Sequence, residues 1–488
     1  MNKQESYKQI VKNTGLFGGV EILRILLNVL QTKVIALLLG PAGVGIINMF
    51  SIVINMFVSG FGFGLNTSAV KEVAQAKASN DEDTIGRTII SLRRIIGFSA
   101  IVGAIVMIVF SHTLSVLTFG NSDYSFQFVI LSLSVIFNIT SNGQYALIKG
   151  MRFLKYLAKC SLLGTSVSLL VSIPFYYWLG KNGVVYVIVI TSFSVLCFSW
   201  FYSRKIEFKH VSISFKESFI VGKDMLKMGF FLMLSTFLAQ LTSFVINAYI
   251  SNEGAIEDVG FYRAGFLVTS HYVGLIFSAM SADFLPRLTA ANKDPQQLST
   301  IVHQQTELAV LIIMPLIAFL FPLVRIFINI LYSSEFYCIE SYIEWAAIGL
   351  IARAYVWTLS YVLLANGESK KFFISEVFYN LTYIILCVLG YNFYSISGLG
   401  LAFLIHNFMC FLFNFYLVHK YCNFNYNKKL ISYIVLTTII SILLFTINHF
   451  WAGIGGKIII VSVALSISCY SIITIKNNTG LKFKRFTK

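Results

Sequence analysis

The sequence predicts an all-α polytopic membrane protein of about fourteen transmembrane helices, and three observations support this prediction. Hydrophobic residues make up 57% of the 488-residue chain and charged residues only 12%, a composition that excludes an ordinary water-soluble domain. Apolar stretches of about 20 residues, the length needed to cross a hydrocarbon core, follow one another from Gly15 to Ile475. Lys and Arg are concentrated in alternate connecting segments, as the positive-inside rule requires.

The distribution of basic residues also predicts the topology. Spans are expected at residues 13–39, 43–66, 88–110, 124–149, 156–179, 183–203, 226–250, 257–285, 304–331, 337–365, 372–392, 396–418, 430–449 and 454–475. With the N-terminus in the cytoplasm, only Lys181 and Lys457 of the 37 basic residues fall in external loops. Both termini are therefore expected to be cytoplasmic, and the net charge of +16 follows from topology signals rather than from nucleic-acid binding.

An internal repeat predicts the domain organisation. A shift of 215 residues carries polar positions of the second span onto polar positions of the eighth, namely Asn48, Asn55, Ser59 and Asn66 onto Arg263, Ser270, Gly274 and Ser281. The same shift carries Val44-Gly45 onto Val259-Gly260 and Asn138 onto Arg353. We therefore expect two pseudo-symmetric six-helix lobes, residues 1–203 and 226–420, joined by a basic linker, 204–225. Residues 421–488 hold two extra helices and a basic tail.

Polar residues recur along one face of several spans at helical spacing. The first span carries Glu21, Arg24, Asn28, Gln31 and Thr32; the second carries Asn48, Ser51, Asn55, Ser59, Gly62 and Asn66; the fourth carries Gln127, Ser134, Asn138, Ser141, Tyr145 and Lys149; the seventh carries Thr236, Gln240, Ser243, Asn247 and Ser251. A polar face within the bilayer is expected to line a bundle interior or a hydrated cavity.

Apart from the basic residues counted with the adjoining loops, five fall within the predicted spans, and they suggest an anionic substrate. A guanidinium group keeps its proton and grips phosphate oxygens through two hydrogen bonds. The substrate-binding candidates are Arg24, Lys33, Asn48, Asn138, Arg263 and Arg353. Two alternatives stay open: Glu21 and Arg24 are three residues apart and can neutralise each other, and Lys33 can extend to the interface. Arg325 is expected at the outer interface.

Acidic residues are the candidates for ion coupling, because a carboxylate can bind a proton or Na⁺. These candidates are Glu21, Asp283 and Glu307, although for Asp283 an ion pair with Arg287 is the simpler explanation. His271 and His406 are expected to be interhelical hydrogen-bond partners. The seven cysteines follow no metal-binding or disulfide pattern and are expected to be packing residues, so no metal or cofactor is predicted.

Two segments carry a family resemblance. "LLLGPAGVGIINMFSIVINMFVSGFGFG" (37–64) resembles the first helical hairpin of the Wzx-type O-antigen flippases, and "QYALIKGMRFLKY" (144–156) resembles the exit of their fourth span. These flippases belong to the multidrug, oligosaccharidyl-lipid and polysaccharide (MOP) exporter superfamily. The resemblance implies a cationic central cavity with alternating access, in which Arg24 and Arg263 match sites that carry cavity cations in relatives.

The resemblance also implies what the protein moves. It implies transfer of an undecaprenyl-diphosphate-linked O-antigen unit, or a related oligosaccharide, across the bacterial inner membrane, with coupling to H⁺ or Na⁺. Membrane lipids and other polysaccharide-assembly proteins are the implied partners. The main alternative is a cation-coupled multidrug exporter of the same superfamily, which would require deep acidic residues that are scarce here. An enzyme is disfavoured because the predicted external loops are short and contain no catalytic motif.

Overall fold

The computed structural model describes residues 3–291, 294–422, 424–451 and 453–479. Side chains within these ranges are described except at residues 3–19, 21, 22, 271, 272, 275, 282, 369, 454, 478 and 479. Over the described residues the chain is helical without strands, and ten segments are long and apolar enough to cross a membrane. The all-α polytopic prediction is confirmed, while the total of fourteen spans and the cytoplasmic termini remain predictions.

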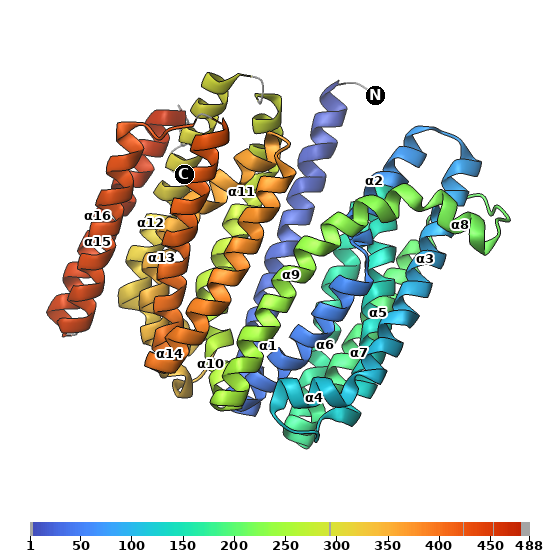
Figure 1. Ribbon diagram of the computed structural model, residues 1–488, viewed down its shortest axis with the longest axis horizontal. Coiled ribbons are helices and arrows are strands. Elements are labelled where there is room, and N and C mark those ends of the chain that lie inside the picture. The colour runs from blue at the N-terminus through green and yellow to red at the C-terminus, as the bar shows by residue number, and fades with distance from the viewer. Residues whose placement is uncertain (1–2, 292–293, 423, 452, 480–488) are drawn as a thin grey trace, which may run out of the picture. The chain divides into compact units, whose positions relative to one another are not determined.

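The chain divides into two compact units, residues 1–260 with 331–333 and residues 261–330 with 334–488. The first unit contains α1 (Lys3–Phe61), α2 (Leu65–Ala78), α3 (Glu82–Val109), α4 (Ser111–Phe119), α5 (Ser125–Gly150), α6 (Leu154–Leu179), η1 (Gly180–Asn182), α7 (Gly183–Ser203), α8 (Phe215–Val221) and α9 (Lys223–Glu253) (Figure 1). The predicted lobe boundary at residues 204–225 would place α9 with the second lobe. The compact units are defined by contacts within the structure, whereas the lobes were inferred from the internal repeat. The lobe assignment therefore stays a prediction.

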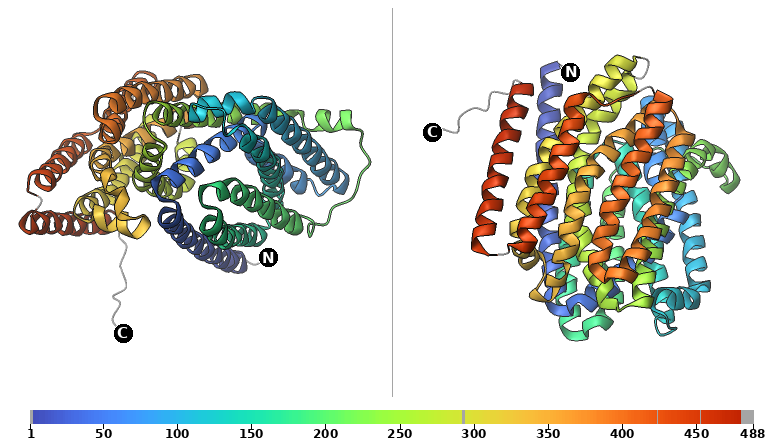
Figure 2. Two further views of the ribbon diagram at one scale, coloured as in Figure 1. Left: turned by 90° about the horizontal axis from the view of Figure 1, so that it is seen from below. Right: turned by 60° about the vertical axis from the view of Figure 1, so that its left-hand side comes forward.

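The boundary between the units falls within α10 (Ile256–Phe266). The other helices of the second unit are η2 (Leu267–His271), α11 (Tyr272–Ala290), α12 (Pro295–Leu331), η3 (Ser334–Ile339), α13 (Glu340–Ala365), α14 (Ser369–Cys422), α15 (Lys428–Phe450) and α16 (Ile454–Thr479). Helix α13 is the most buried of the ten candidate spans and packs along α14. Helices α15 and α16 lie side by side in the same unit, where the Tyr433 and Tyr470 hydroxyls are 2.9 Å apart (Figure 2).

Helices α1 and α14 are interrupted where the sequence predicts a boundary between spans, whereas a further interruption falls inside an expected span. Helix α1 breaks at Gly40, whose φ of 63° is readily accessible only to glycine, and Pro41 follows at a position where a helix can begin. Helix α14 breaks at Tyr394 and Ser395. The eighth expected span, 257–285, is divided into α10, a π-helical turn η2 and α11.

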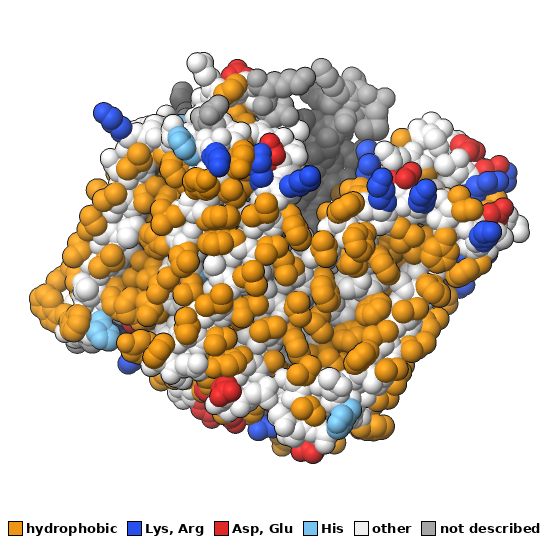
Figure 3. Space-filling view, in the orientation of Figure 1, with side chains coloured by type: hydrophobic (Ala, Val, Ile, Leu, Met, Phe, Trp, Pro, Cys, Tyr) orange, Lys and Arg blue, Asp and Glu red, His pale blue; other side chains and the backbone are white. Residues whose placement is uncertain are grey.

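Charge and hydropathy are arranged within each unit as a bilayer requires. Figure 3 shows hydrophobic side chains over the helix surfaces of each unit on the visible face, with most of the visible Lys and Arg side chains near one end of the helices. In the first unit the basic linker is held at such an end, because Arg94 donates to the Ile213 carbonyl at 2.7 Å. Short helix α8 begins there with a capping box between Ser214 and Glu217.

A close contact within the first unit follows the predicted 215-residue repeat. A Cβ atom added to Gly45 would lie 2.1 Å from the Ile256 carbonyl oxygen, and one added to Gly260 would lie 2.1 Å from the Pro41 carbonyl oxygen. Pro41 and Ile256 are themselves 215 residues apart, as are Gly45 and Gly260. The contact is therefore reciprocal, as it is across a two-fold axis.

Two hydrogen bonds in the first unit repeat this symmetry. Lys33 donates through Nζ to the Tyr332 carbonyl, and Asn252 donates through Nδ2 to the Leu117 carbonyl at 2.9 Å. The two acceptor carbonyls are 215 residues apart. The donors, Lys33 and Asn252, differ from that spacing by one helical turn. These contacts support the internal duplication inferred from the polar stripes.

Candidate substrate site

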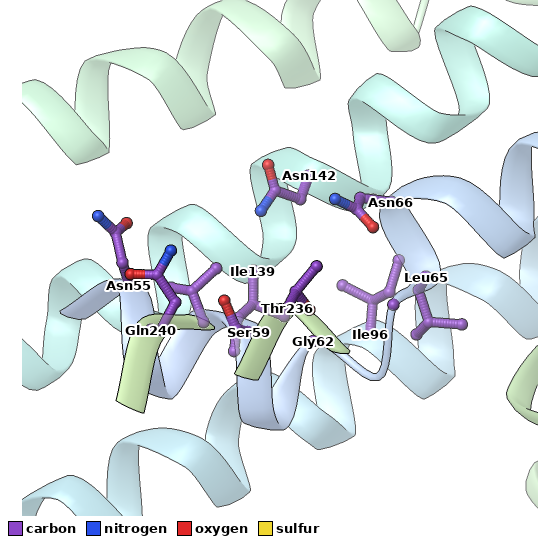
Figure 4. Close-up of a pocket in the computed structure, with 13 residues that line it drawn as sticks. Asn55, Ser59, Gly62, Leu65, Asn66, Ile96, Ile139, Asn142, Thr236 and Gln240 are labelled. Atoms are coloured by element: carbon purple, nitrogen blue, oxygen red, sulfur yellow. The ribbon is translucent and has the colours of Figure 1, made fainter. Parts of the chain in front are cut away.

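A polar pocket with a volume of about 290 Å³ lies in the first unit, between α1, α3, α5, α9 and the start of α2 (Figure 4). It is lined by Asn55, Val58, Ser59, Gly62, Gly64, Leu65, Asn66, Ile96, Ile139, Asn142, Gly143, Thr236 and Gln240. None of these lining residues is ionisable. Figure 4 shows Asn55, Gln240, Asn66 and Asn142 placing side-chain amide groups around the pocket.

Helical spacing and one sharp turn bring these amides together. Asn55 and Ser59 are four residues apart and therefore share a face of α1. The chain then turns through Gly64, with φ of 59°, which places Asn66 in the first turn of α2. Thr236 and Gln240 share a face of α9 in the same way. The pocket thus joins parts of two polar stripes that the sequence predicted separately.

The lining groups can bind the hydroxyl and amide groups of an uncharged sugar. A carboxamide offers two N–H donors and a carbonyl acceptor, and a hydroxyl is both donor and acceptor, so this set matches the alternating hydroxyls of a sugar ring. Val58, Ile96 and Ile139 supply apolar contacts. The volume is at the lower end of the range of about 300–1,000 Å³ for small-molecule sites, so the pocket can receive only part of an oligosaccharide.

Arg24 lies in the first part of α1, on the face that runs along α6. Its Nη1 donates to Ser161 Oγ at 3.2 Å, and one heptad further on Gln31 Nε2 donates to Ser168 Oγ at 2.8 Å. The Arg24 side chain is half-buried in the first unit. The Glu21 side chain falls outside the described residues, so the alternative of a Glu21–Arg24 pair stays open.

Arg353 of α13 lies inside the second unit, half-buried. Its Nη1 donates to Ser270 Oγ at 2.9 Å, and its guanidinium carbon lies 5.7 Å from the centroid of the Phe403 ring. The ion pairs found among the described side chains do not include Arg353. Arg263 of α10 is also half-buried in this unit. Among the described side chains, Arg353 thus retains guanidinium donors that are not paired with a carboxylate.

The other predicted substrate-binding residues bond to distant segments of the chain and do not line the described pocket. Asn48 is buried and donates to Asn247 Oδ1 at 2.9 Å, while Asn138 donates to the Ser192 hydroxyl at 3.1 Å. Lys33 donates to the Tyr332 carbonyl. The pocket residue Asn142 was missed, although it follows Ser141, which belongs to the predicted stripe of the fourth span.

Two of the three predicted coupling acids form ion pairs. Asp283 lies 3.3 Å from Arg287, the simpler alternative considered above, and Glu307 lies 2.7 Å from Lys429. Glu21 is the third. Glu344 was not among the predicted candidates; it is buried near the start of α13 and accepts a hydrogen bond from Asn448. Its position beyond the first turn of an apolar helix is the signal that could have revealed it.

Comparison with known proteins now places the chain in a family. The family model described as "Polysaccharide biosynthesis protein" matches residues 34–341. The chain belongs to the polysaccharide biosynthesis protein family. The match includes the whole candidate pocket and the Gly40–Gly45 turn on which the resemblance rested. A search of curated protein sequences found no match.

Solved structures show that this family member has the MOP superfamily fold. The lipid II flippase MurJ in an inward closed conformation has a TM-score of 0.71 at 15% identity, covering 96% of this chain and 100% of the other. An inward-facing multidrug resistance MATE family transporter has a TM-score of 0.69 at 15% identity, covering 82% and 94%. A MOP superfamily transporter from Pyrococcus furiosus has a TM-score of 0.57 at 16% identity, covering 83% and 93%. At such identities the likeness shows the fold alone.

Proposed function

We propose that this polysaccharide biosynthesis protein is a flippase for a lipid-linked oligosaccharide in the bacterial inner membrane. The observation that carries the proposal is the pocket of amides and hydroxyls in the first unit, which is free of ionisable side chains. Such a lining suits a neutral sugar better than a cationic drug, for which acidic or aromatic side chains are the expected partners. The match to a polysaccharide biosynthesis family supports the same substrate class.

The second part of the substrate is proposed to be a diphosphate linked to undecaprenol. Arg353 in the second unit is half-buried and contacts a serine hydroxyl, a weak neutral partner that phosphate oxygens can replace, and Arg24 in the first unit is a second candidate. Arg263 and Lys33 are further candidates for this role. A flippase needs only to bind and release its cargo, and the chain would act by alternating access, driven by H⁺ or Na⁺ rather than by covalent chemistry.

The names of the structurally similar proteins agree with a transport function for this chain. One relative with the same fold is named a lipid II flippase, whereas others are named multidrug transporters. The multidrug alternative makes a different prediction, because it requires efflux of cationic dyes. We expect dye efflux to be unchanged when the gene is deleted or overexpressed, and surface polysaccharide to be lost on deletion.

The test is a flipping assay on variants of the pocket. Gln240→Leu removes one amide from the lining with little change in side-chain volume, and Gln75→Leu makes the same change at an exposed position of α2. We expect Gln240→Leu to lower flipping about three- to tenfold, the effect of one hydrogen bond to a neutral group. Gln75→Leu should retain wild-type flipping, with equal membrane insertion of both variants.

Identification of the cargo provides a second readout. Native mass spectrometry of the purified full-length protein should detect a polyprenyl diphosphate glycan in the wild type and less of it in Gln240→Leu. Normal flipping and normal glycan retention by Gln240→Leu would contradict the assignment of the pocket. Retention of a cationic amphiphile in place of a glycan would contradict the proposed function itself.

A further inference from the structure

A second polar pocket lies in the second unit, at one end of its helix bundle. It has a volume of about 420 Å³ and is lined by Arg325, Tyr337, Cys338, Glu340, Ser341, Glu344, Asn448, His449 and Lys457. These residues come from the end of α12, from η3, from the start of α13, from the end of α15 and from the start of α16. Lys428 and Lys429 lie at the start of α15 and Lys476 in the last turn of α16, so the pocket is at the other end of these helices.

The charges of this pocket are balanced. Arg325 Nε lies 2.8 Å from Glu340 Oε2, and Lys457 is an exposed lining residue. Glu344 is only 7% exposed and accepts a hydrogen bond from Asn448 Nδ2 at 2.5 Å. Two acidic and two basic side chains therefore line the pocket, together with His449. A ligand with a net charge gains little in such a site, whereas a zwitterion can pair each of its charges.

The surroundings of the pocket indicate a lipid. Large apolar side chains close in sequence to its lining residues are exposed on the same helix ends, namely Ile326 and Ile330 on α12, Phe450 at the end of α15 and Trp451 directly after it. Aromatic residues such as Trp are typical of the membrane–water interface. A polar pocket beside an apolar helix surface, at the level of the membrane–water interface, fits the headgroup of a lipid whose acyl chains lie along the helices.

We propose that this pocket binds the headgroup of a zwitterionic phospholipid with a primary ammonium group, of the phosphatidylethanolamine class. The ammonium, with its three N–H donors, would donate to Glu344 and Glu340. The phosphate would accept from Arg325 and Lys457. Since α13, α15 and α16 all contribute to the pocket, a bound headgroup would hold α15 and α16 against the rest of the second unit. This site is independent of the proposed sugar pocket.

The test compares lipid retention by variants of the full-length protein. The purified protein is exchanged into equal amounts of phosphatidylethanolamine, phosphatidylcholine and phosphatidylglycerol, and retained lipid is measured by native mass spectrometry. We expect the wild type to prefer phosphatidylethanolamine over phosphatidylcholine about tenfold, as the loss of charge-assisted N–H donors predicts. Glu344→Gln should abolish this preference, and Glu335→Gln, an exposed change in η3, should keep it.

Thiol labelling provides a readout that does not depend on lipid counting. Cys338 lines the pocket and is exposed, as are Cys197 and Cys469 elsewhere, so the last two are replaced by Ser. Labelling of Cys338 by a charged maleimide should be several-fold slower in phosphatidylethanolamine vesicles than in phosphatidylcholine vesicles. The difference should disappear in Glu344→Gln.

A variant of a residue proposed to bind the lipid phosphate keeps the proposal testable if Glu344→Gln does not fold. Lys457→Gln should weaken retention of phosphatidylethanolamine, and Lys428→Gln, at the opposite end of α15, should not. Equal retention of phosphatidylethanolamine and phosphatidylcholine by the wild type would overturn the proposal. An unchanged preference in folded Glu344→Gln, or Cys338 labelling that ignores the lipid, would overturn it as well.

Discussion

Arg353 is the residue whose surroundings bear most directly on the proposed diphosphate. Its guanidinium group contacts a serine hydroxyl and an aromatic ring rather than a carboxylate among the described side chains. We expect Arg353→Ala to reduce flipping at least tenfold, since a charge-assisted hydrogen bond contributes about 1.5–3 kcal/mol. Arg353→Lys should recover only part of the activity, because an ammonium group cannot form the bidentate contact.

The control for Arg353 is an arginine outside both proposed sites. Arg87 is exposed on α3, and Arg87→Ala should leave flipping unchanged. Flipping is measured in proteoliposomes that contain equal amounts of inserted protein. Full activity of Arg353→Ala would exclude a role for this residue in substrate binding.

The sequence predicted the polar faces but not the partner of each polar residue. Asn55, Ser59 and Asn48 share one stripe of the second span, and only the first two line the pocket, whereas Asn48 bonds to Asn247. Periodicity specifies the face of a helix. Whether a polar residue on that face is already hydrogen-bonded to a neighbouring side chain depends on packing between distant segments. A single sequence does not reveal this packing.

At the scale of the elements, α1 can approach the start of α10 closely only because residue 45 is a glycine and has no side chain. Gly45→Val would force branched carbon atoms against the Ile256 carbonyl, since even a Cβ atom would lie 2.1 Å from its oxygen. We expect destabilisation by about 1–3 kcal/mol, typical of overpacking. Gly97→Ala, at a helix position with nothing within 4 Å, should raise stability slightly. Thermal unfolding of the detergent-purified variants measures both, and an unchanged Tm for Gly45→Val would contradict the contact.

The start of α3 should depend on pH. Asp81 caps this helix, and hydrogen bonds from the Thr84 hydroxyl and then from the Asp83 N–H lower the pKa of its carboxyl group below the ordinary 3.8. A lowered pKa means that the cap stabilises the helix fully above pH 3.8 and loses this effect as the pH falls through the lower, folded-state value.

Hydrogen exchange at the first turn of α3 tests this cap. In the wild type, protection of the Thr84 amide should decrease as the pH falls through the pKa of Asp81, after correction for the intrinsic exchange rate. Asp81→Asn retains a capping oxygen without a titrating proton, so its protection should not change with pH. Constant protection of the wild type would show that the carboxylate does not act as the cap.

At the scale of the whole molecule, the proposed transport cycle requires some helix contacts to separate. Within the first unit, α1 contacts α9 through the hydrogen bond from Asn48 to Asn247. In a chain with its exposed cysteines replaced, we expect Asn48→Cys/Asn247→Cys to react with a short bifunctional methanethiosulfonate. This cross-link should stop flipping, and a reductant should restore it.

The matched control joins two helices within the second unit. The Thr306 and Thr358 hydroxyls are 3.1 Å apart on α12 and α13. Cross-linked Thr306→Cys/Thr358→Cys should flip at the wild-type rate, because these buried neighbours are expected to move together. Undiminished flipping by cross-linked Asn48→Cys/Asn247→Cys would mean that this contact stays closed throughout transport.

The fold class could be predicted from the sequence because a bilayer imposes simple rules on span length, hydropathy and loop charge. The 215-residue spacing inferred from the similar local patterns of Gly45 and Gly260 recurs in their reciprocal contact, while the two-lobe organisation stays a prediction. The two pockets were not predictable as cavities. Their shapes depend on how α1, α9 and α13 pack against neighbours far along the chain, and Glu344 gains its importance only from Asn448, about a hundred residues away.

Under the predicted duplication of the two lobes, the reciprocal contact of Gly45 and Gly260 would have an evolutionary consequence. Each glycine lies against the turn that precedes its counterpart, so a half-length ancestor would have needed only one such glycine, facing its own copy across the axis of a homodimer. Any enlargement of that residue would have introduced two clashes at once. Gene fusion would later have released the two positions to vary separately, and both have nevertheless stayed without a side chain.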